Sequence, residues 1–116
     1  MFPEADRIRL QHMHDATREA LGYAENKSRE DLDRDSMLFR ALVKCIEIIG
    51  EAASRIGSET KQTTTTIPWG KINGMRNRLI HAYFDINKDL VWGTVMRDLP
   101  TLDRELTIIL GKNPNN

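Results

Sequence analysis

The sequence predicts an all-α protein, a compact up-and-down bundle of four to five helices. Apolar residues recur at three- and four-residue steps through most of the chain, which is the period of an amphipathic helix. No segment alternates apolar and polar residues as a strand does, and Asn73-Gly74 lies inside a helical pattern rather than between two strands. A length of 116 residues suits one hydrophobic core. We therefore expect a single helical domain over residues 1–111 and a flexible tail over residues 112–116.

The first helix is expected to follow Pro3, because proline is favoured in a first turn, where its missing N–H would be unpaired anyway. About six turns follow. Their inward positions are Leu10, Met13, Thr17, Ala20, Leu21 and Ala24. Residues 26–28 form a polar break. Ser28 and Asp31 then have the spacing of an N-terminal capping arrangement.

The second long helix has the clearest pattern in the chain. Its apolar stripe consists of Leu38, Leu42, Cys45, Ile49, Ala52 and Ile56, and Gly57 is expected to cap its C-terminus. Further apolar residues widen this surface, namely Val43, Ile46, Ile48 and Ala53. Such a helix should be buried on more than one side, either within its own bundle or partly against a partner chain. Cys45 lies on the stripe and is expected to be a buried structural thiol.

The third helix is expected to begin at Pro68 and Trp69, after a surface loop over residues 58–67 that contains four consecutive threonines. It is short, and its Gly70 and Gly74 each cost about 1 kcal/mol relative to alanine in a helix interior. Close approach of another backbone or of a phosphate is one reason to keep such glycines.

The remaining chain predicts two more helices. Asp85 is expected to cap the fourth, and Pro100 is expected to interrupt it. Thr101 would then cap a last helix that Gly111 ends.

The charges are balanced overall but unevenly placed. The chain has 17 basic and 17 acidic residues, which argues against a protein that coats nucleic acid by bulk electrostatics. Residues 60–84 nevertheless contain four basic residues and no acidic one. This window is the place to look for an anion-binding site.

Several classes of protein are not expected. No apolar run approaches the roughly 20 residues of a membrane span, and no apolar stretch follows the N-terminus, so we expect neither membrane insertion nor export. A single cysteine excludes an internal disulfide and fits the cytoplasm. His12 and His14 are two residues apart, whereas a helical zinc pair needs four, so we expect no metal site. Phosphate-cradling glycine motifs are absent, and no cofactor is expected.

Residues 76–83 carry groups that could do chemistry. Arg76 and Tyr83 are seven residues apart, and Asn77 and His81 four, so that each pair stacks on a helix. A guanidinium matches phosphate oxygens, and an imidazole transfers protons near pH 7. Metal-free RNA cleavage needs these groups: a base activates the ribose 2′-OH toward the adjacent phosphate, and arginine stabilises the transition state. The spacing alone also fits, and more commonly marks, a solvated helix face with one hydrogen-bonded histidine and a half-buried tyrosine.

The pattern Arg76-x4-His81-x-Tyr83 resembles the Arg-x4-His-x-Tyr signature of the HepT-like toxins, a branch of the HEPN ribonuclease superfamily. The resemblance covers nearly the whole chain. Its other parts are the segment from Glu47 to Ala53 with Gly50-Glu51-Ala52, then Ile67-Pro68-Trp69, Gly74-Met75-Arg76-Asn77, Trp92 and Asp98-Leu99-Pro100.

This resemblance implies a HEPN-like homodimer in which both copies of Arg76 and His81 line one cleft and act as catalytic residues, with Asn77 in support. The implied activity is that of a metal-independent endoribonuclease, with tRNA as one target class. The implied partner is a minimal nucleotidyltransferase, the antitoxin of a type VII-like toxin–antitoxin system, which transfers AMP to Tyr83. AMP beside Arg76 would repel incoming RNA.

From charge alone, Lys71, Arg78 and Lys88 are candidates for RNA contacts. Two alternatives stay open. One is a non-catalytic helical binding companion of a nucleotidyltransferase, and the other is a purely structural helical dimer.

Overall fold

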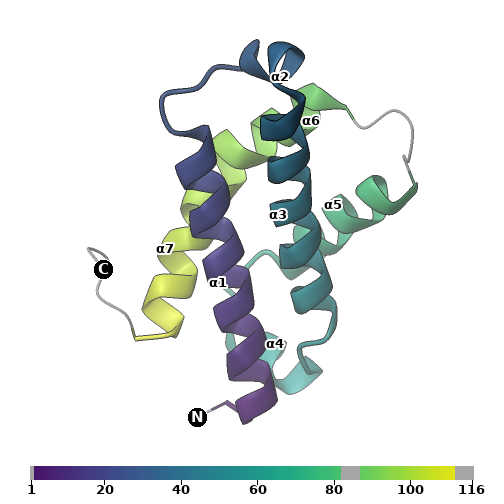
Figure 1. Ribbon diagram of the computed structural model, residues 1–116. Helices are drawn as coiled ribbons and strands as arrows, with labels where there is room; N and C mark the ends of the chain where they lie inside the picture. Colours follow the sequence, from purple (N-terminus) through teal and green to yellow (C-terminus); the bar gives the residue numbers. More distant parts are fainter. Residues whose placement is uncertain (1, 82–86, 112–116) are drawn as a thin grey trace.

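The computed structural model describes residues 2–81 and 87–111, with Ile80 and His81 described by their backbone alone, and all regular elements in those ranges are helical (Figure 1). They are α1 (Glu4–Ala24), α2 (Asp31–Arg34), α3 (Ser36–Ser54), α4 (Ser58–Thr63), α5 (Trp69–His81), α6 (Lys88–Gly93), the π-helical turn η1 (Thr94–Asp98) and α7 (Leu99–Ile109). The all-α prediction is confirmed for the described residues.

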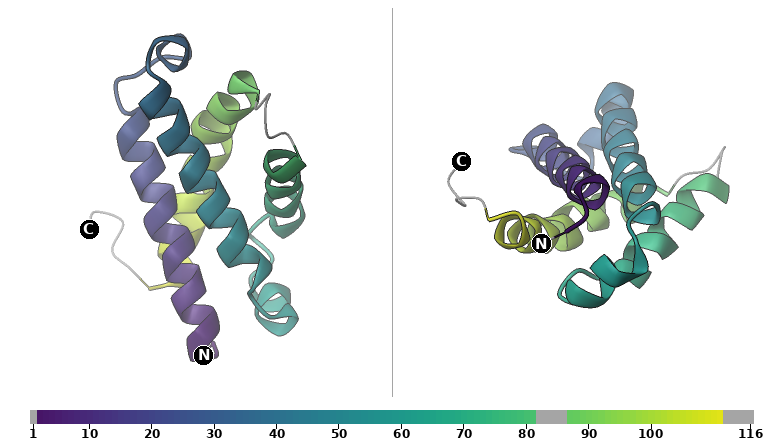
Figure 2. Two further views of the ribbon diagram at one scale, coloured as in Figure 1. Left: turned by 45° about the vertical axis from the view of Figure 1, so that its right-hand side comes forward. Right: turned by 90° about the horizontal axis from the view of Figure 1, so that it is seen from below.

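The long helices run alternately up and down. The chain ascends in α1, descends in α3, ascends in α5 and descends through α6, η1 and α7 (Figure 1). The most extensive helix–helix contact joins α1 to α3, while α5 packs on α3 and α7 packs on α1 (Figure 2). The arginine and the backbone of the histidine of the predicted motif both belong to α5, which packs on α3.

Helix α3 forms because its N-terminus is capped and its apolar residues face the bundle. The carboxylate of Asp35 accepts a hydrogen bond of 3.0 Å from the backbone N–H of Leu38, as expected of a capping aspartate. Of the residues that widen its apolar surface, Val43, Ile46 and Ala53 are buried within this chain, and Ile48 is exposed. The chain's own helices therefore cover most of the surface for which the sequence also allowed a partner chain.

The core is drawn from all the long helices. Its fully buried large side chains are Leu10, Met13, Leu32, Leu42, Ile67, Leu106, Val91 and Val95. Burying one such side chain contributes about 1.5–3 kcal/mol, so packing outweighs helix propensity in holding the bundle together.

Two buried polar contacts tie α1 to its neighbours. Near the start of α1, the buried carboxylate of Asp6 accepts hydrogen bonds from the Thr60 hydroxyl at 2.6 Å and the Gly57 N–H at 3.3 Å. Further along, His14 Nε2 lies 3.1 Å from Asp103 Oδ1 and 3.0 Å from Thr107 Oγ1. These contacts fix α4 and α7 against α1.

The prediction of a surface loop over residues 58–67 is wrong for its first part, where α4 forms. The hydroxyls of Thr63 and Thr64 both donate to the Thr60 carbonyl, and Thr64 is buried. The threonines therefore make local hydrogen bonds that a low-complexity run did not suggest. Gly57 does not cap α3, which ends three residues earlier at Ser54; it precedes α4 instead.

The predicted boundaries of the last helices are wrong as well. Asp85 lies outside the described residues, and the side chain of Asn87 caps α6 by accepting from the N–H of Leu90 at 3.1 Å. Pro100 does not interrupt the helix, and Thr101 does not cap a new one. In η1 the backbone hydrogen bonds span five residues instead of four, as in the bond from the N–H of Leu99 to the Thr94 carbonyl. Pro100 then stands in the first turn of α7, where a missing N–H is tolerated.

The C-terminal boundary of α7 agrees with the sequence. Gly111 follows the helix with φ of 68°, the left-handed conformation expected of a C-terminal glycine. The tail over residues 112–116, which the sequence predicts to fray, lies outside the described residues.

Candidate functional site

Arg76 projects from α5 against α3, where two consecutive residues contact it. The Cβ, Cγ and Cδ atoms of Arg76 lie 2.8, 3.0 and 3.1 Å from the point where a Cβ on Gly50 would stand. The bare backbone at Gly50 is therefore what lets the aliphatic stem of Arg76 lie on α3.

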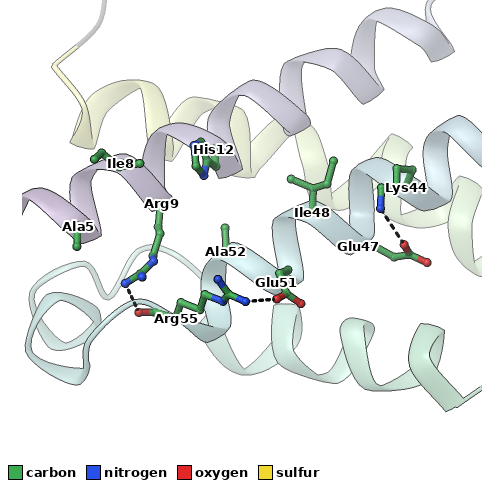
Figure 3. A pocket seen from close by; sticks show the side chains of 10 residues that line it. All are labelled: Ala5, Ile8, Arg9, His12, Lys44, Glu47, Ile48, Glu51, Ala52 and Arg55. Carbon is green, nitrogen blue, oxygen red and sulfur yellow. Dashed lines mark hydrogen bonds and ion pairs between the residues drawn. The ribbon is translucent and has the colours of Figure 1, made fainter.

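The guanidinium end of the same side chain is held by the next residue. Arg76 Nη2 donates to Glu51 Oε2 at 3.2 Å, and the Arg76 side chain retains 28% of its exposure. The other carboxylate oxygen of Glu51, Oε1, accepts from Arg55 Nη2 at 2.9 Å (Figure 3). One carboxylate thus links two guanidinium groups at the surface of α3.

Glu51 also lines a groove of about 520 Å³ between α1 and α3 (Figure 3). The residues that line it are Ala5, Ile8, Arg9, His12, Lys44, Glu47, Ile48, Glu51, Ala52 and Arg55. Within it, Arg9 donates to the Arg55 carbonyl at 3.0 Å, and Lys44 Nζ lies 3.9 Å from Glu47 Oε2. The groove mixes both signs of charge with apolar side chains, and Glu51 connects it to Arg76.

The structure places the other predicted catalytic and supporting residues as follows. Asn77 is exposed on α5. The backbone of His81 forms the last residue of α5, and its side chain lies outside what the structure describes. Tyr83 lies outside the described residues. Of the predicted catalytic pair, Arg76 is the residue whose side chain the structure describes.

The three candidates for RNA contact do not gather around Arg76. Lys71 and Arg78 line a separate hollow of about 540 Å³ between α5 and the α6–η1 segment. Lys71 Nζ forms an ion pair with Asp98 Oδ1 at 2.8 Å. Lys88 forms one with Asp33 at 3.3 Å, and its ammonium lies 5.7 Å from the centre of the Phe39 ring.

Cys45 is buried, as predicted. Burial raises the pKa of its thiol to about 11, with the nearby charge of Glu19 acting in the same direction. A thiol of this kind stays protonated at neutral pH and is not a nucleophile there.

Glu51 is the site residue that sequence reasoning missed. The sequence named it only within the resemblance at Gly50-Glu51-Ala52, and its partner Arg76 is 25 residues away. Helix spacing cannot reveal a contact between two helices.

No helix within residues 2–81 and 87–111 is long and apolar enough to cross a membrane.

Comparisons with known proteins assign the chain to a family. The family described as "Ribonuclease HepT-like" matches residues 13–109. A protein of Caldanaerobacter subterraneus subsp. tengcongensis named "Putative RNase" is 40% identical over 85 residues, which are 73% of this chain and 76% of that one. The "Probable ribonuclease HepT" of Thermococcus cleftensis is 40% identical over 73 residues, 63% of this chain and 66% of that one.

A longer relative comes from Methanocaldococcus jannaschii. It is named "Gamma-glutamylcyclotransferase and putative RNase" and is 34% identical over 113 residues, which are 95% of this chain and 51% of that protein. No solved structure gives a significant match. Because the family match spans most of the helical bundle, including Gly50, Glu51 and Arg76, the chain belongs to the ribonuclease HepT-like family.

Proposed function

We propose that this protein is a metal-independent endoribonuclease that cleaves RNA with Arg76 and His81, and that it is the toxin of a type VII-like toxin–antitoxin pair. The position of Arg76 carries the proposal. Its guanidinium is partly exposed and fixed against α3, in a chain that belongs to a ribonuclease family and has the Arg-x4-His-x-Tyr pattern.

The proposed reaction needs no metal ion. A base takes the proton of a ribose 2′-OH, the 2′-oxygen bonds to the adjacent phosphorus, and the bond from phosphorus to the 5′-oxygen breaks. The leaving 5′-oxygen takes up a proton, which gives a 2′,3′-cyclic phosphate and a 5′-hydroxyl. His81 exchanges these protons near pH 7, Asn77 orients its ring, and Arg76 stabilises the negative charge that develops on the phosphoryl oxygens.

The cleft is proposed to form between two copies of the chain. Helix α5 packs chiefly on α3, and its residues Asn77 and Arg78 are exposed, so a face of α5 is open to a second copy. Two α5 helices near a two-fold axis would bring both copies of Arg76 and His81 to one RNA strand. The RNA phosphates are proposed to contact Lys71, Arg78 and Lys88. They would compete with Asp98 for Lys71 and with Asp33 for Lys88.

Regulation is proposed to act on Tyr83. A minimal nucleotidyltransferase antitoxin, with both proteins in the cytoplasm, would transfer AMP from ATP to the phenolic oxygen and release pyrophosphate. Tyr83 follows Arg76 by seven positions in the sequence and comes two positions after the last residue of α5. An adenylyl phosphate near Arg76 would compete with the RNA phosphate for the guanidinium.

The test uses the full chain, purified without a partner and incubated with total tRNA and other RNAs in EDTA. We expect cleavage by the wild type and its loss in Arg76→Ala and in His81→Ala. Arg104→Ala is the matched control, because it removes an exposed arginine of α7 that donates to the Thr101 hydroxyl, three residues earlier, at 3.3 Å. It should cleave as the wild type does.

Cleavage by Arg76→Ala at the wild-type rate would refute the assignment of this residue. No cleavage of any RNA by the wild-type dimer would favour the binding companion of a nucleotidyltransferase instead. The Tyr83 proposal is tested by mass spectrometry after incubation with the partner and ATP: the chain should gain the mass of AMP in steps, and Tyr83→Phe should gain none.

A further inference from the structure

We infer that Glu51 is a positioning residue for the proposed cleavage: its carboxylate holds the Arg76 guanidinium where the phosphate is to bind. The inference rests on the proposed function, because it takes Arg76 as the group that contacts the phosphate. Glu51 itself is not proposed to touch RNA.

The side chain of Arg76 is restrained at both ends by neighbouring residues of α3. Its stem lies on the bare backbone of Gly50, and its guanidinium is bonded to the carboxylate of Glu51 at 3.2 Å. Arginine is a long side chain that loses many rotamers when it is fixed. An arginine already held in one geometry meets a phosphate without that loss, which is the advantage of a preorganised site.

The contact contributes little to the stability of the fold. The Glu51 side chain is 52% exposed and that of Arg76 28%, and ion pairs so open to water add little to the free energy of unfolding. An effect of Glu51 on the reaction would therefore come from the orientation of Arg76 and not from the integrity of the bundle.

The geometry leaves Arg76 able to bind a phosphate while Glu51 holds it. A guanidinium has five N–H donors, and the bond to Glu51 uses Nη2. The side chain is 28% exposed, and its remaining donors are the ones that we expect to bind the phosphate. Arg55 bonds to the second carboxylate oxygen at 2.9 Å, so the negative charge of Glu51 is shared and opposes the incoming phosphate less.

The test compares the steady-state kinetics of RNA cleavage by Glu51→Gln and Glu51→Ala with those of Glu47→Gln. Glu47 is one helical turn away on α3, lines the same groove and carries the same charge, but it pairs with Lys44 at 3.9 Å. Glu47→Gln therefore reproduces the change of charge without removing the Arg76 contact, and it should keep the wild-type kcat.

We expect kcat to fall by about tenfold in Glu51→Ala, since small misplacements of a catalytic group have effects of this size or more. The fall should be smaller in Glu51→Gln, whose amide oxygen can still accept the hydrogen bond. KM should not rise in either variant, because a negative charge near the phosphate has been removed. The thermal midpoints should stay near that of the wild type.

A second measurement is independent of activity. In NMR spectra of ¹⁵N-labelled protein, the Arg76 side-chain N–H signals should show slow guanidinium rotation in the wild type and in Glu47→Gln, and faster rotation in Glu51→Ala. Equal rotation in all three proteins would overturn the inference.

The kinetic outcomes separate this inference from the proposed function. An unchanged kcat in Glu51→Ala, together with an inactive Arg76→Ala, would overturn the role of Glu51 and leave the ribonuclease proposal standing. A raised KM with unchanged kcat would also overturn it, since Glu51 would then act in binding. If Arg76→Ala is as active as the wild type, the proposed role of Arg76 in cleavage is wrong, and the inference about Glu51 is wrong with it.

Discussion

Replacing Gly50 by alanine tests the packing of Arg76 against α3. The added Cβ would lie 2.8 Å from the Arg76 Cβ, closer than such atoms approach in real structures. The nearest atom belongs to the start of the Arg76 side chain and not to its mobile end, so it cannot swing away. Helices α3 and α5 must therefore move apart by a few tenths of an ångström or more.

Two effects of opposite sign decide the magnitude. Alanine in place of glycine in a helix interior stabilises by about 1 kcal/mol, whereas overpacking of this kind costs about 1–3 kcal/mol. The Gly50→Ala variant should thus lie between no change and a loss of about 2 kcal/mol in the free energy of unfolding. Gly74→Ala is the control, because a Cβ at Gly74 of α5 meets no atom within 4 Å, and it should gain up to about 1 kcal/mol.

The assay is urea and thermal unfolding followed by far-UV circular dichroism, with all variants at one protein concentration because association raises the apparent midpoint. The two variants should differ by about 1–3 kcal/mol, or roughly 4–12 °C in the midpoint for a domain of this size. Gly50→Ala should also lose RNA cleavage, as Arg76 is displaced. A Gly50→Ala protein as stable as Gly74→Ala would refute the close packing described here.

Two further predictions concern buried groups. Burial raises the pKa of the Cys45 thiol from 9.0 to about 11, so the contribution of Cys45 to the free energy of unfolding is full below pH 9 and is lost as the pH rises toward 11. In urea unfolding between pH 9 and 11, the stability of the wild type should fall more steeply with pH than that of Cys45→Ala. Parallel curves for the two proteins would contradict this account. Asp6→Ala leaves the buried Thr60 hydroxyl and the Gly57 N–H without their acceptor, and chemical unfolding should show a loss of about 1–3 kcal/mol in the free energy of unfolding. The control is Glu4→Ala, which removes an exposed acid from the same first turn and should change the free energy of unfolding by less than about 0.5 kcal/mol.

The long helices could be predicted from the sequence because their information is local. The stripe from Leu38 to Ile56 has one period, and the observed α3 contains it as far as Ala52, ending at Ser54. The start of α5 at Trp69 after Pro68 and the end of α7 before Gly111 follow from the backbone preferences of proline and glycine.

The errors arise where a distant contact or an unusual ladder decides the structure. Helix α4 depends in part on the bond between Thr60 and Asp6, which are 54 residues apart. The helical chain continues past Pro100 because of the π-helical turn η1, and no pattern of residues predicts such a turn. The contact between Glu51 and Arg76 joins two helices, and a single sequence without relatives to compare cannot show which faces of two helices meet.

The widened turn between α6 and α7 accommodates one residue more than an ordinary helical turn. Each residue added to or removed from a helix turns the following part by about 100°. Deleting one residue within Thr94–Asp98 should restore an ordinary ladder and leave Asp103 and Thr107 facing His14, whereas deleting one residue from the regular helix between Leu99 and Asp103 would rotate both away from α1. A one-residue deletion should therefore be tolerated better in this turn than in the regular part of α7, where the docking of the C-terminal helix depends on the number of residues before Asp103.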